Sequence, residues 1–422
     1  MFSLPWFLHG ALTAALLYHV LLAGSDAESR AVAARRAARR ASRRAAVPTA
    51  AMPLDDVVAF EEPLRTGDFS EGKDELESPW KGPMVRAVGR DELFRVVLVA
   101  DLDTASMSAS EDHWRSELHY VTLLRDHSTG RYSVASVNNR APERAPGAAE
   151  IDARVWRDDA NAGPVDIVSR VADNGRSMEL SDLILFGGRL LSMDDRTGIL
   201  FELLPDGMAV PRQILMDGDG TSVKGFKGEW ATIKDDRLFI GGLGKEWTEP
   251  RADGSHEIKH TDPCWVKVLD DSFGLKSFNW LAVYDRLREA SGHAHPGYVL
   301  HEAVVFNHAA REWIFLPRRA SRDSYDEVAD EMRGTNIIFF ASEDFKHLRM
   351  RTLGPLEPQR GFSSFKLVPG HGEELVAIKS EEVNGRIASH IVAFHLNGTV
   401  LMDSVPLGDV KLEGVEFIPH TS

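Results

Sequence analysis

The sequence is poor in cysteine: Cys264 is the only one among 422 residues, so no disulfide bond forms within the chain. Histidine and cysteine do not cluster with the spacing of a zinc site, which leaves oxygen atoms as the available metal ligands. Long segments with a hydrophobic period of 3.6 residues are nearly absent, and this argues against a helical fold. The sequence therefore points to a fold of short strands.

Basic residues are also scarce outside the N-terminal region. The net charge is −15, yet the first 50 residues carry seven arginines against Asp26 and Glu28, so the rest of the chain is more acidic than the whole. Such a body lacks the basic surface that binds nucleic-acid phosphates, and this excludes nucleic acid as a partner. Its acidity suits either a bound metal ion or simple solubility.

The N-terminal region has two unusual segments. Residues 3–23 form an uncharged, apolar run of about the length that crosses a bilayer, and small residues follow it. We expect residues 1–25 to be a signal peptide or a signal anchor, with membrane anchoring through 3–23, and residues 26–80 to be a stem that is first basic and then acidic. Arginines after the apolar run favour a cytosolic flank, which conflicts with an uncleaved anchor and a lumenal body. An organelle transit sequence fits as well.

We favour entry into the secretory pathway, either as a membrane-anchored protein of the ER or Golgi lumen or as a secreted one. The sequence Asn397-Gly398-Thr399 is a glycosylation sequon, which supports lumenal exposure.

From about Val85 onward, short β-type runs alternate with Gly, Asp and Asn turns. Five times a Ser or Glu opens a short hydrophobic strand, at intervals of roughly 50 to 70 residues, which suits four-stranded blades with insertions. We therefore predict an all-β, five-bladed β-propeller over residues 85–420. The early strand 93–100 should join the last blade and close the circle. A helix is expected only at 279–292, with a charged helical turn at 322–333.

The innermost strand of each blade borders the central channel, so the five repeated positions should form one ring. Glutamates converging there would repel one another without a cation. Glu and Ser oxygens suit the six- to eightfold coordination of Ca²⁺, and the ring predicts a central Ca²⁺ site. In the alternative interpretation, each Glu is an ordinary solvated residue at a strand end. The five positions are Ser181, Glu229, Glu302, Ser363 and Glu413.

The densest mixture of acids, bases, glycines and tryptophans lies at 215–247. Its Asp-Gly-Asp-Gly turn fails the EF-hand pattern because Ser222 occupies the sixth position, and Gly244-Lys245 is followed by Glu246 rather than the Ser or Thr of a P-loop. We expect the loops on this face to hold a phosphate chain. The catalytic candidates are Asp101, Asp103, Asp194, Asp217 and Asp219.

Cations and a ring system for substrate binding are expected on the same face. Two adjacent arginines, placed on a loop, would clamp a phosphate in bidentate fashion. The substrate-binding candidates are Arg196, Lys224, Lys227, Lys245, Trp247, Arg318, Arg319 and Lys379.

Several motifs between about residues 95 and 418 resemble those of the calcium-activated nucleotidase (apyrase) family, and they occur in the same order: DLDTAS, MELSDL, DGDGTSVKGFKGEW, GGLGKEW, HEAVVF and EGVEF. The resemblance implies a five-bladed propeller with one Ca²⁺ in its channel, held at the five ring positions. It implies hydrolysis of nucleoside di- and triphosphates such as UDP, GDP and UTP, with ADP used by some members. Dimerisation is left open.

In the mechanism we expect, Asp101 or Asp103 orients or deprotonates the attacking water. Two other functions remain open from the residues alone. One is a non-catalytic Ca²⁺-binding propeller that binds a protein partner. The other is a Ca²⁺-propeller lactonase or phosphotriesterase, although such sites usually include Asn and Asp ligands.

Overall fold

The structure is a computed structural model that describes residues 80–110, 112–138, 163–251 and 256–420. All of them belong to one compact unit, residues 53–422. The segments 1–25 and 3–23, and the stem except for its last residue, lie outside the described residues. Within the described ranges, no helix has the length and apolar character needed to cross a membrane.

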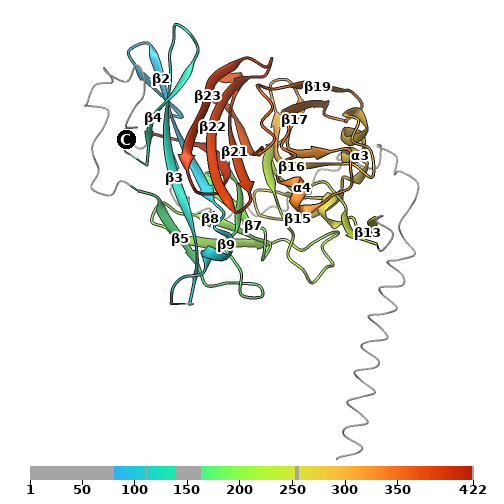
Figure 1. Ribbon diagram of the computed structural model, residues 1–422. Helices are drawn as coiled ribbons and strands as arrows, with labels where there is room; N and C mark the ends of the chain where they lie inside the picture. Colours follow the sequence, from blue (N-terminus) through green and yellow to red (C-terminus); the bar gives the residue numbers. More distant parts are fainter. Residues whose placement is uncertain (1–79, 111, 139–162, 252–255, 421–422) are drawn as a thin grey trace, which may run out of the picture. The chain divides into compact units, whose positions relative to one another are not determined.

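Five antiparallel sheets follow one another around a common centre (Figure 1). The first contains β6 (Leu180–Phe186), β7 (Arg189–Asp194), β8 (Ile199–Leu203) and β9 (Ala209–Ile214). The second contains β10 (Trp230–Lys234), β11 (Arg237–Gly241), β14 (Trp265–Leu269) and β15 (Leu275–Asn279). The third contains β16 (Tyr298–Asn307), β17 (Glu312–Ser321), β18 (Ile337–Ser342) and β19 (Leu348–Thr352). The fourth contains β20 (Arg360–Val368), β21 (His371–Val383), β22 (Arg386–His395) and β23 (Val400–Gly408).

The fifth sheet joins the two ends of the described chain. It contains β24 (Leu412–Ile418), β2 (Asp91–Ala100), β3 (Trp114–Arg125) and β4 (Tyr132–Val137), with β1 (Val85–Val88) paired to β2 and β5 (Val165–Ser169) paired to β3. β2 and β24 pair antiparallel from Arg95 opposite Ile418 to Ala100 opposite Leu412. The innermost strands β6, β10, β16, β20 and β24 each contact the next, and β24 contacts β6. The predicted five-bladed propeller and its closure by strand 93–100 are confirmed.

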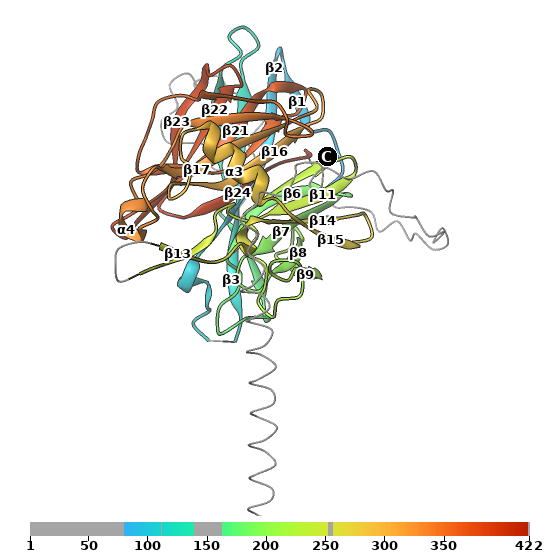
Figure 2. The same cartoon turned by 90° about the vertical axis from the view of Figure 1, so that its right-hand side faces the viewer.

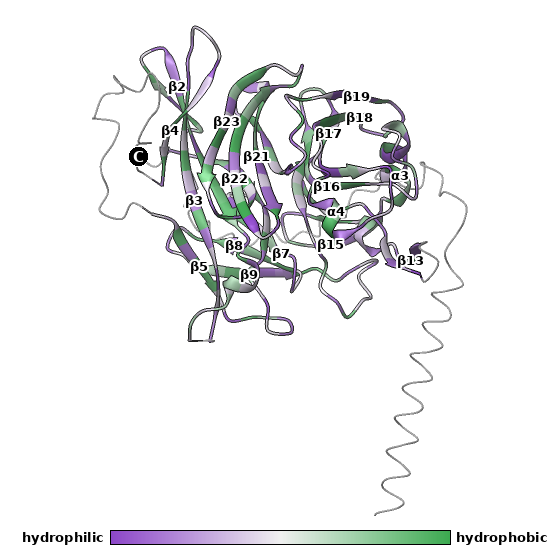
Figure 3. Ribbon diagram, in the orientation of Figure 1, coloured by the Kyte–Doolittle hydropathy of each residue, from purple (hydrophilic) through white to green (hydrophobic). Residues whose placement is uncertain are grey.

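Hydrophobic packing between blades explains why these segments form strands. Figure 3 shows hydrophobic residues concentrated along the strands and hydrophilic residues at the turns. Five separate clusters of buried side chains fill the spaces between neighbouring blades. Between the second and third blades, Trp280 and Trp313 meet edge to face with their ring centroids 5.0 Å apart. Because both faces of every sheet are covered, strands carry long apolar runs rather than a strict alternation.

Shorter elements decorate the blades (Figure 2). The helix α3 (Leu281–Ala290) falls in the predicted range 279–292, and α4 (Glu327–Asp330) in the predicted turn 322–333. A hairpin of β12 (Trp247–Pro250) and β13 (His256–His260) is inserted between β11 and β14. Two 3₁₀ turns, η1 (Asp103–Ser106) and η3 (Asp262–Cys264), complete the described elements.

Irregularities in the innermost strands coincide with the repeated positions. The pairing register shifts between Ser181 and Ile184, between His301 and Val304, between Phe362 and Ser364, and opposite Glu413. A bulge of this kind leaves a residue unpaired and re-aims its side chain. The prediction that all five residues open a strand is wrong for Glu302 and Ser363, which lie inside β16 and β20. These two strands begin earlier because their first residues also pair with the neighbouring strand.

Candidate active site and metal centre

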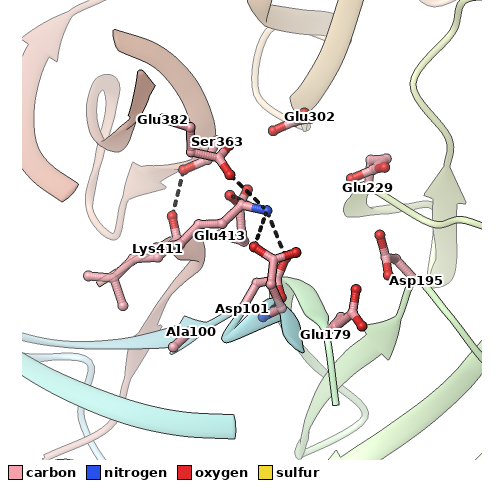
Figure 4. Close-up of polar contacts among 12 residues, drawn as sticks. Ala100, Asp101, Glu179, Asp195, Glu229, Glu302, Ser363, Glu382, Lys411 and Glu413 are labelled. Carbon is pink, nitrogen blue, oxygen red and sulfur yellow. Dashed lines mark hydrogen bonds and ion pairs between the residues drawn. The ribbon is translucent and has the colours of Figure 1, made fainter. Parts of the chain in front are cut away.

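The innermost strands bring three glutamates together. Glu229 precedes β10, Glu302 lies in β16 and Glu413 lies in β24, and each is less than a tenth exposed. Figure 4 shows their carboxylates directed toward a shared space, which Asp101, Glu179 and Asp195 approach from the side. We call Ser181, Glu229, Glu302, Ser363 and Glu413 the ring.

A buried cation, Arg318, and a partly buried one, Lys411, pair with the carboxylates on one side of the ring. Arg318, in β17, donates to both Glu413 oxygens at 3.0 Å and to Glu302 and Glu382. Lys411 lies 2.8 Å from an oxygen of Asp101 and 3.7 Å from Glu413. Burial raises the pKa of Glu413 to about 8, although the nearby Arg318 and Lys411 lower it.

A third cation serves the opposite side. Lys227 pairs with Asp195 and lies 2.8 Å from Glu229. Burial raises the pKa of Glu229 to about 7 against the influence of Lys227, and Glu302 raises it further. Asp195 has a buried Oδ1 atom without a hydrogen-bond partner among the described residues.

The ring serines are buried as well. Ser363 Oγ donates a hydrogen bond of 2.8 Å to the Leu412 carbonyl, so its lone pairs remain available as acceptors. Ser181 is 6% exposed, and its carbonyl accepts a hydrogen bond of 2.9 Å from Ser192. Both hydroxyls sit on bulged segments of innermost strands.

A second acidic group lies beside the ring. Carboxylate oxygens of Asp101, Asp103 and Glu179 lie within 4.8 Å of one another, and we call these three residues the rim cluster. Arg176 donates to both oxygens of Glu179 at 2.6 Å and lies 3.5 Å from Asp103. Burial and the neighbouring Asp195 raise the pKa of Glu179 to about 7, while Arg176 lowers it. Burial also raises the pKa of Asp103, against the lowering effect of Lys411.

The donor set fits a hard divalent cation. All donors are carboxylate or hydroxyl oxygens, which Ca²⁺ and Mg²⁺ prefer. The carboxylates outnumber Arg318, Lys411 and Lys227, and burial holds two of the glutamates close to protonation. A cation among them would favour their ionised forms and would give the orphaned oxygen of Asp195 a partner.

Other predicted residues have partners that suggest structural roles. Asp194 is fully buried, and its oxygens accept hydrogen bonds from Arg196 and Thr197 in its own turn and from Ser177 and Met178 in the segment before β6. Its neighbour Asp195 faces the ring instead (Figure 4). The structure therefore brings Asp195, and not Asp194, to the site.

The stretch 215–247 contributes less than its composition indicates. Asp217 is buried and accepts from the Gly218 amide at 3.1 Å, while Asp219 accepts from Thr221. Lys224 is more than half exposed and lies 3.4 Å from Asp217. These hydrogen bonds lie within the turn, so they support turn chemistry for Asp217 and Asp219.

The predicted Arg318–Arg319 clamp is wrong in its placement, because both residues lie in the strand β17 and not in a loop. Arg318 pairs with ring carboxylates, whereas Arg319 pairs with Asp330 at 3.3 Å. The two guanidinium groups therefore hold different partners and do not form one clamp.

Three remaining candidates have partners outside the ring. Lys379 is 2.8 Å from Glu357 and lies over the ring of Phe362. Lys245 donates 2.9 Å to the carbonyl of Glu246, and burial lowers its pKa. Trp247, half exposed on the β12–β13 hairpin, stacks on His260. Arg196 stays near the site, 3.8 Å from Glu179.

Sequence reasoning gave no role to several residues that complete the site. Lys411 stands two positions before Glu413, just ahead of β24, so its only signal was its closeness in sequence to that glutamate. Glu179 lies within the motif MELSDL quoted above, and Glu382 lies within KSEE (residues 379–382), a further motif of the same family resemblance, so both residues carried a signal. Arg176 precedes MELSDL and carried no signal. A cavity of about 550 Å³ beside α3 is lined by none of the candidate residues.

Several known proteins are similar to this chain in sequence. A sequence model of the apyrase family matches residues 148–418. The chain is 42% identical over 326 residues to soluble calcium-activated nucleotidase 1 of Mus musculus, covering 77% of this chain and 74% of that protein. It is 44% identical to apyrase apy-1 of Caenorhabditis elegans, covering 59% and 70%, and 34% identical to an apyrase of Cimex lectularius, covering 77% and 82%.

The fold and the site define an all-β propeller with a carboxylate-rich axial centre. The chain belongs to the apyrase family. It is accordingly a nucleotide phosphoanhydride hydrolase, and this decides against the non-catalytic propeller and the lactonase considered above.

Proposed function

We propose that the chain hydrolyses nucleoside di- and triphosphates, with UDP, GDP, UTP and ADP as substrates, in a Ca²⁺-dependent reaction at the ring. The observation that carries the proposal is the excess of buried carboxylates over cations on the propeller axis, together with the orphaned oxygen of Asp195. The name of the mouse relative, a calcium-activated nucleotidase, supports Ca²⁺ over Mg²⁺.

Ser181, Glu229, Glu302, Ser363 and Glu413 are the proposed ligand set. When bound, Ca²⁺ supplies positive charge that neutralises phosphate oxygens as the phosphoanhydride bond breaks. Arg318 and Lys411 hold Glu302 and Glu413 in place from the protein side, at the distances given above. Lys227 likewise holds Glu229 in place, so this ion pair has a structural role as well as an electrostatic one.

We propose that the general base, the group that removes a proton from the attacking water, belongs to the rim cluster. Asp101 is buried and committed to Lys411 at 2.8 Å, whereas the side chain of Asp103 is 43% exposed. Burial raises the pKa of Asp103, and a more basic carboxylate accepts a proton from water more readily. We therefore propose that Asp103 removes the proton and that Asp101 orients Asp103. The Oδ1 atom of Asp101 accepts a hydrogen bond of 2.8 Å from the backbone amide of Asp103.

Cations near the rim cluster are the proposed contacts of the phosphate chain. Arg176 and Arg196 are each about a third exposed and share Glu179 as a partner. An arginine that keeps one edge in solvent can donate to phosphate while its other edge pairs with a carboxylate. Trp247, which is half exposed, remains the residue predicted to stack on the nucleobase.

The decisive experiment is a nucleotide panel assayed for released phosphate with Ca²⁺, with Mg²⁺ and with EDTA. We expect release from UDP, GDP, UTP and ADP with Ca²⁺ and a loss of activity in EDTA that added Ca²⁺ restores. Equal activity in excess EDTA would refute the metal dependence.

We also propose that the chain enters the secretory pathway, because the apolar segment 3–23 and the sequon at Asn397 both fit lumenal exposure. N-terminal sequencing of the mature protein from a eukaryotic host should start beyond residue 20 if the segment is cleaved. An intact Met1 on a membrane-bound protein would indicate an anchor, and an intact Met1 on a soluble one would contradict the proposal.

A further inference from the structure

Asp182, next to Ser181 in β6, is a carboxylate for which the proposed reaction has no role. Its side chain is only 1% exposed. Its oxygens accept hydrogen bonds from the Ala231 amide at 2.8 Å and from Ser364 Oγ at 2.6 Å, and Lys366 Nζ lies 3.0 and 3.1 Å from them. These partners come from β10 and β20, so one carboxylate joins three innermost strands.

The contacts extend to the last blade. Ser364 directly follows Ser363, and its Oγ accepts a hydrogen bond of 3.2 Å from the Val415 amide in β24. Val415 stands two residues after Glu413. A displacement of Ser364 would therefore also displace Ser363 and Glu413, two of the five ring residues.

The other two attachments also adjoin ring residues. Ala231 stands two residues after Glu229, and Lys366 reaches its carbonyl at 3.4 Å. On the near side, Ser192 Oγ donates to the carbonyls of Ser181 and Asp182 at 2.9 and 2.8 Å. Only Glu302, in β16, has no neighbour among these hydrogen bonds of the described residues.

The backbone at Asp182 has a conformation that serves this arrangement. Its φ of 29° lies in the left-handed region, which costs a non-glycine residue free energy and persists only where surrounding contacts enforce it. The pairing of β6 with β7 is interrupted here, between Ser181 and Ile184. On the opposite side Gly414 packs so closely that a Cβ at that position would lie 2.6 Å from the Asp182 carbonyl carbon.

We propose that Asp182 is the positioning residue of the metal centre: by tying β6, β10, β20 and β24 together directly beside the ring, it sets the positions of Ser181, Glu229, Ser363 and Glu413. We call Asp182, Ser364 and Lys366 the axial lock. The proposal rests on the proposed function, because it takes those four residues as Ca²⁺ ligands. Asp182 itself stays bonded to protein partners and does not contact the metal.

The test measures Ca²⁺ binding directly, by calorimetry on the folded full chain, alongside turnover. Asp182→Asn leaves Lys366 buried without its counter-charge, so the double variant Asp182→Asn/Lys366→Met, which removes both charges, is the informative one. We expect its affinity for Ca²⁺ to fall about 10- to 100-fold, the usual effect of changing a group that orients metal ligands. Excess Ca²⁺ should restore most of the turnover number, whereas a general loss of folding would not be rescued.

Glu416→Gln is the matched control. Glu416 is also buried and interacts electrostatically with Lys366 and Asp182, but its hydrogen bonds, from the Leu185 and Phe417 amides at 3.1 and 2.8 Å, reach no residue beside a ring position. Its variant should keep wild-type affinity for Ca²⁺. If the double variant does not fold, Ser364→Ala, which removes two hydrogen bonds and no charge, should still weaken Ca²⁺ binding by a smaller factor.

Unchanged Ca²⁺ affinity in a folded double variant, or in Ser364→Ala, would overturn the proposal. So would a fall of the same size in Glu416→Gln, because the effect would then belong to any buried charge of this layer. A wild-type chain that binds no Ca²⁺ would overturn the proposed function itself, and this result is distinct from a wild type and a variant that bind equally well.

Discussion

The ring and the axial lock lie side by side on shared strands and are both buried, yet their balance of charges differs. In the axial lock one carboxylate meets one ammonium and three further donors, and every charge has a partner. In the ring and its surroundings the carboxylates outnumber the cations, and burial raises the pKa of Glu229 and Glu413 far above the usual range. Satisfied buried charges specify a position, whereas unsatisfied ones mark the place where a ligand is to bind.

The largest effect is expected at the rim cluster. Asp103→Asn should lower the turnover number by about 10² to 10⁴, the range of a general base, with little change in Ca²⁺ affinity because Asp103 is not a ring residue. Single-turnover phosphate release at saturating Ca²⁺ measures this. A variant with a wild-type turnover number would remove Asp103 from the role of base.

On the ring itself, Glu229→Gln replaces a charged ligand by a neutral one of the same shape. We expect Ca²⁺ affinity to fall by on the order of 10- to 100-fold, with the fold retained, because Lys227 keeps Asp195 as its partner. Titration of activity and of calorimetric heat with Ca²⁺ should shift together. Wild-type binding would show that the ring is not the metal site.

Two adjacent aspartates sharpen the contrast between ligand and support. Asp195→Asn should weaken Ca²⁺-dependent activity about tenfold with little change in unfolding free energy, because its Oδ1 has no hydrogen-bond partner within the described part of the chain. Asp194→Asn should chiefly lower the unfolding free energy, by about 1 to 3 kcal/mol, because it disturbs hydrogen bonds from four residues. Denaturant unfolding and activity, measured on both variants, compare them. The reverse pattern would reassign the two residues.

The smallest effect concerns pH. Burial raises the pKa of Glu416 to about 7 from an ordinary 4.5, although Lys366 lowers it. Between these two values the folded state binds more protons than the unfolded state, so Glu416 makes the unfolding free energy fall as pH rises, by at most about 1.4 kcal/mol per pH unit. Above pH 7 its contribution is constant.

Glu416→Gln should therefore have a flatter unfolding profile than the wild type between pH 4.5 and 7, measured by urea titration in EDTA. Parallel profiles would contradict the raised pKa.

Much of this architecture is legible in the sequence. The recurrence of Ser or Glu beside short apolar segments predicted the five ring positions, and the structure places each of them in or next to an innermost strand, because a propeller repeats one strand pattern per blade. The apolar run 93–100 predicted the closing strand, since a propeller must pair its terminal strands to remove its sheet edges. Composition alone favoured oxygen ligands, because the chain has one cysteine and many acids.

What the sequence could not show are the contacts that cross between blades. Asp194 and Asp195 are the same residue type side by side, and only the turn that fills the oxygens of one leaves the other open to the ring. Arg318 meets Glu413, 95 positions away, and Lys366 meets Asp182, 184 positions away. No local pattern encodes such pairs, because they depend on how five separately formed sheets close into a circle. Local periodicity determined the blades, and composition favoured oxygen atoms as metal ligands. Closure of the propeller decided which side chains meet.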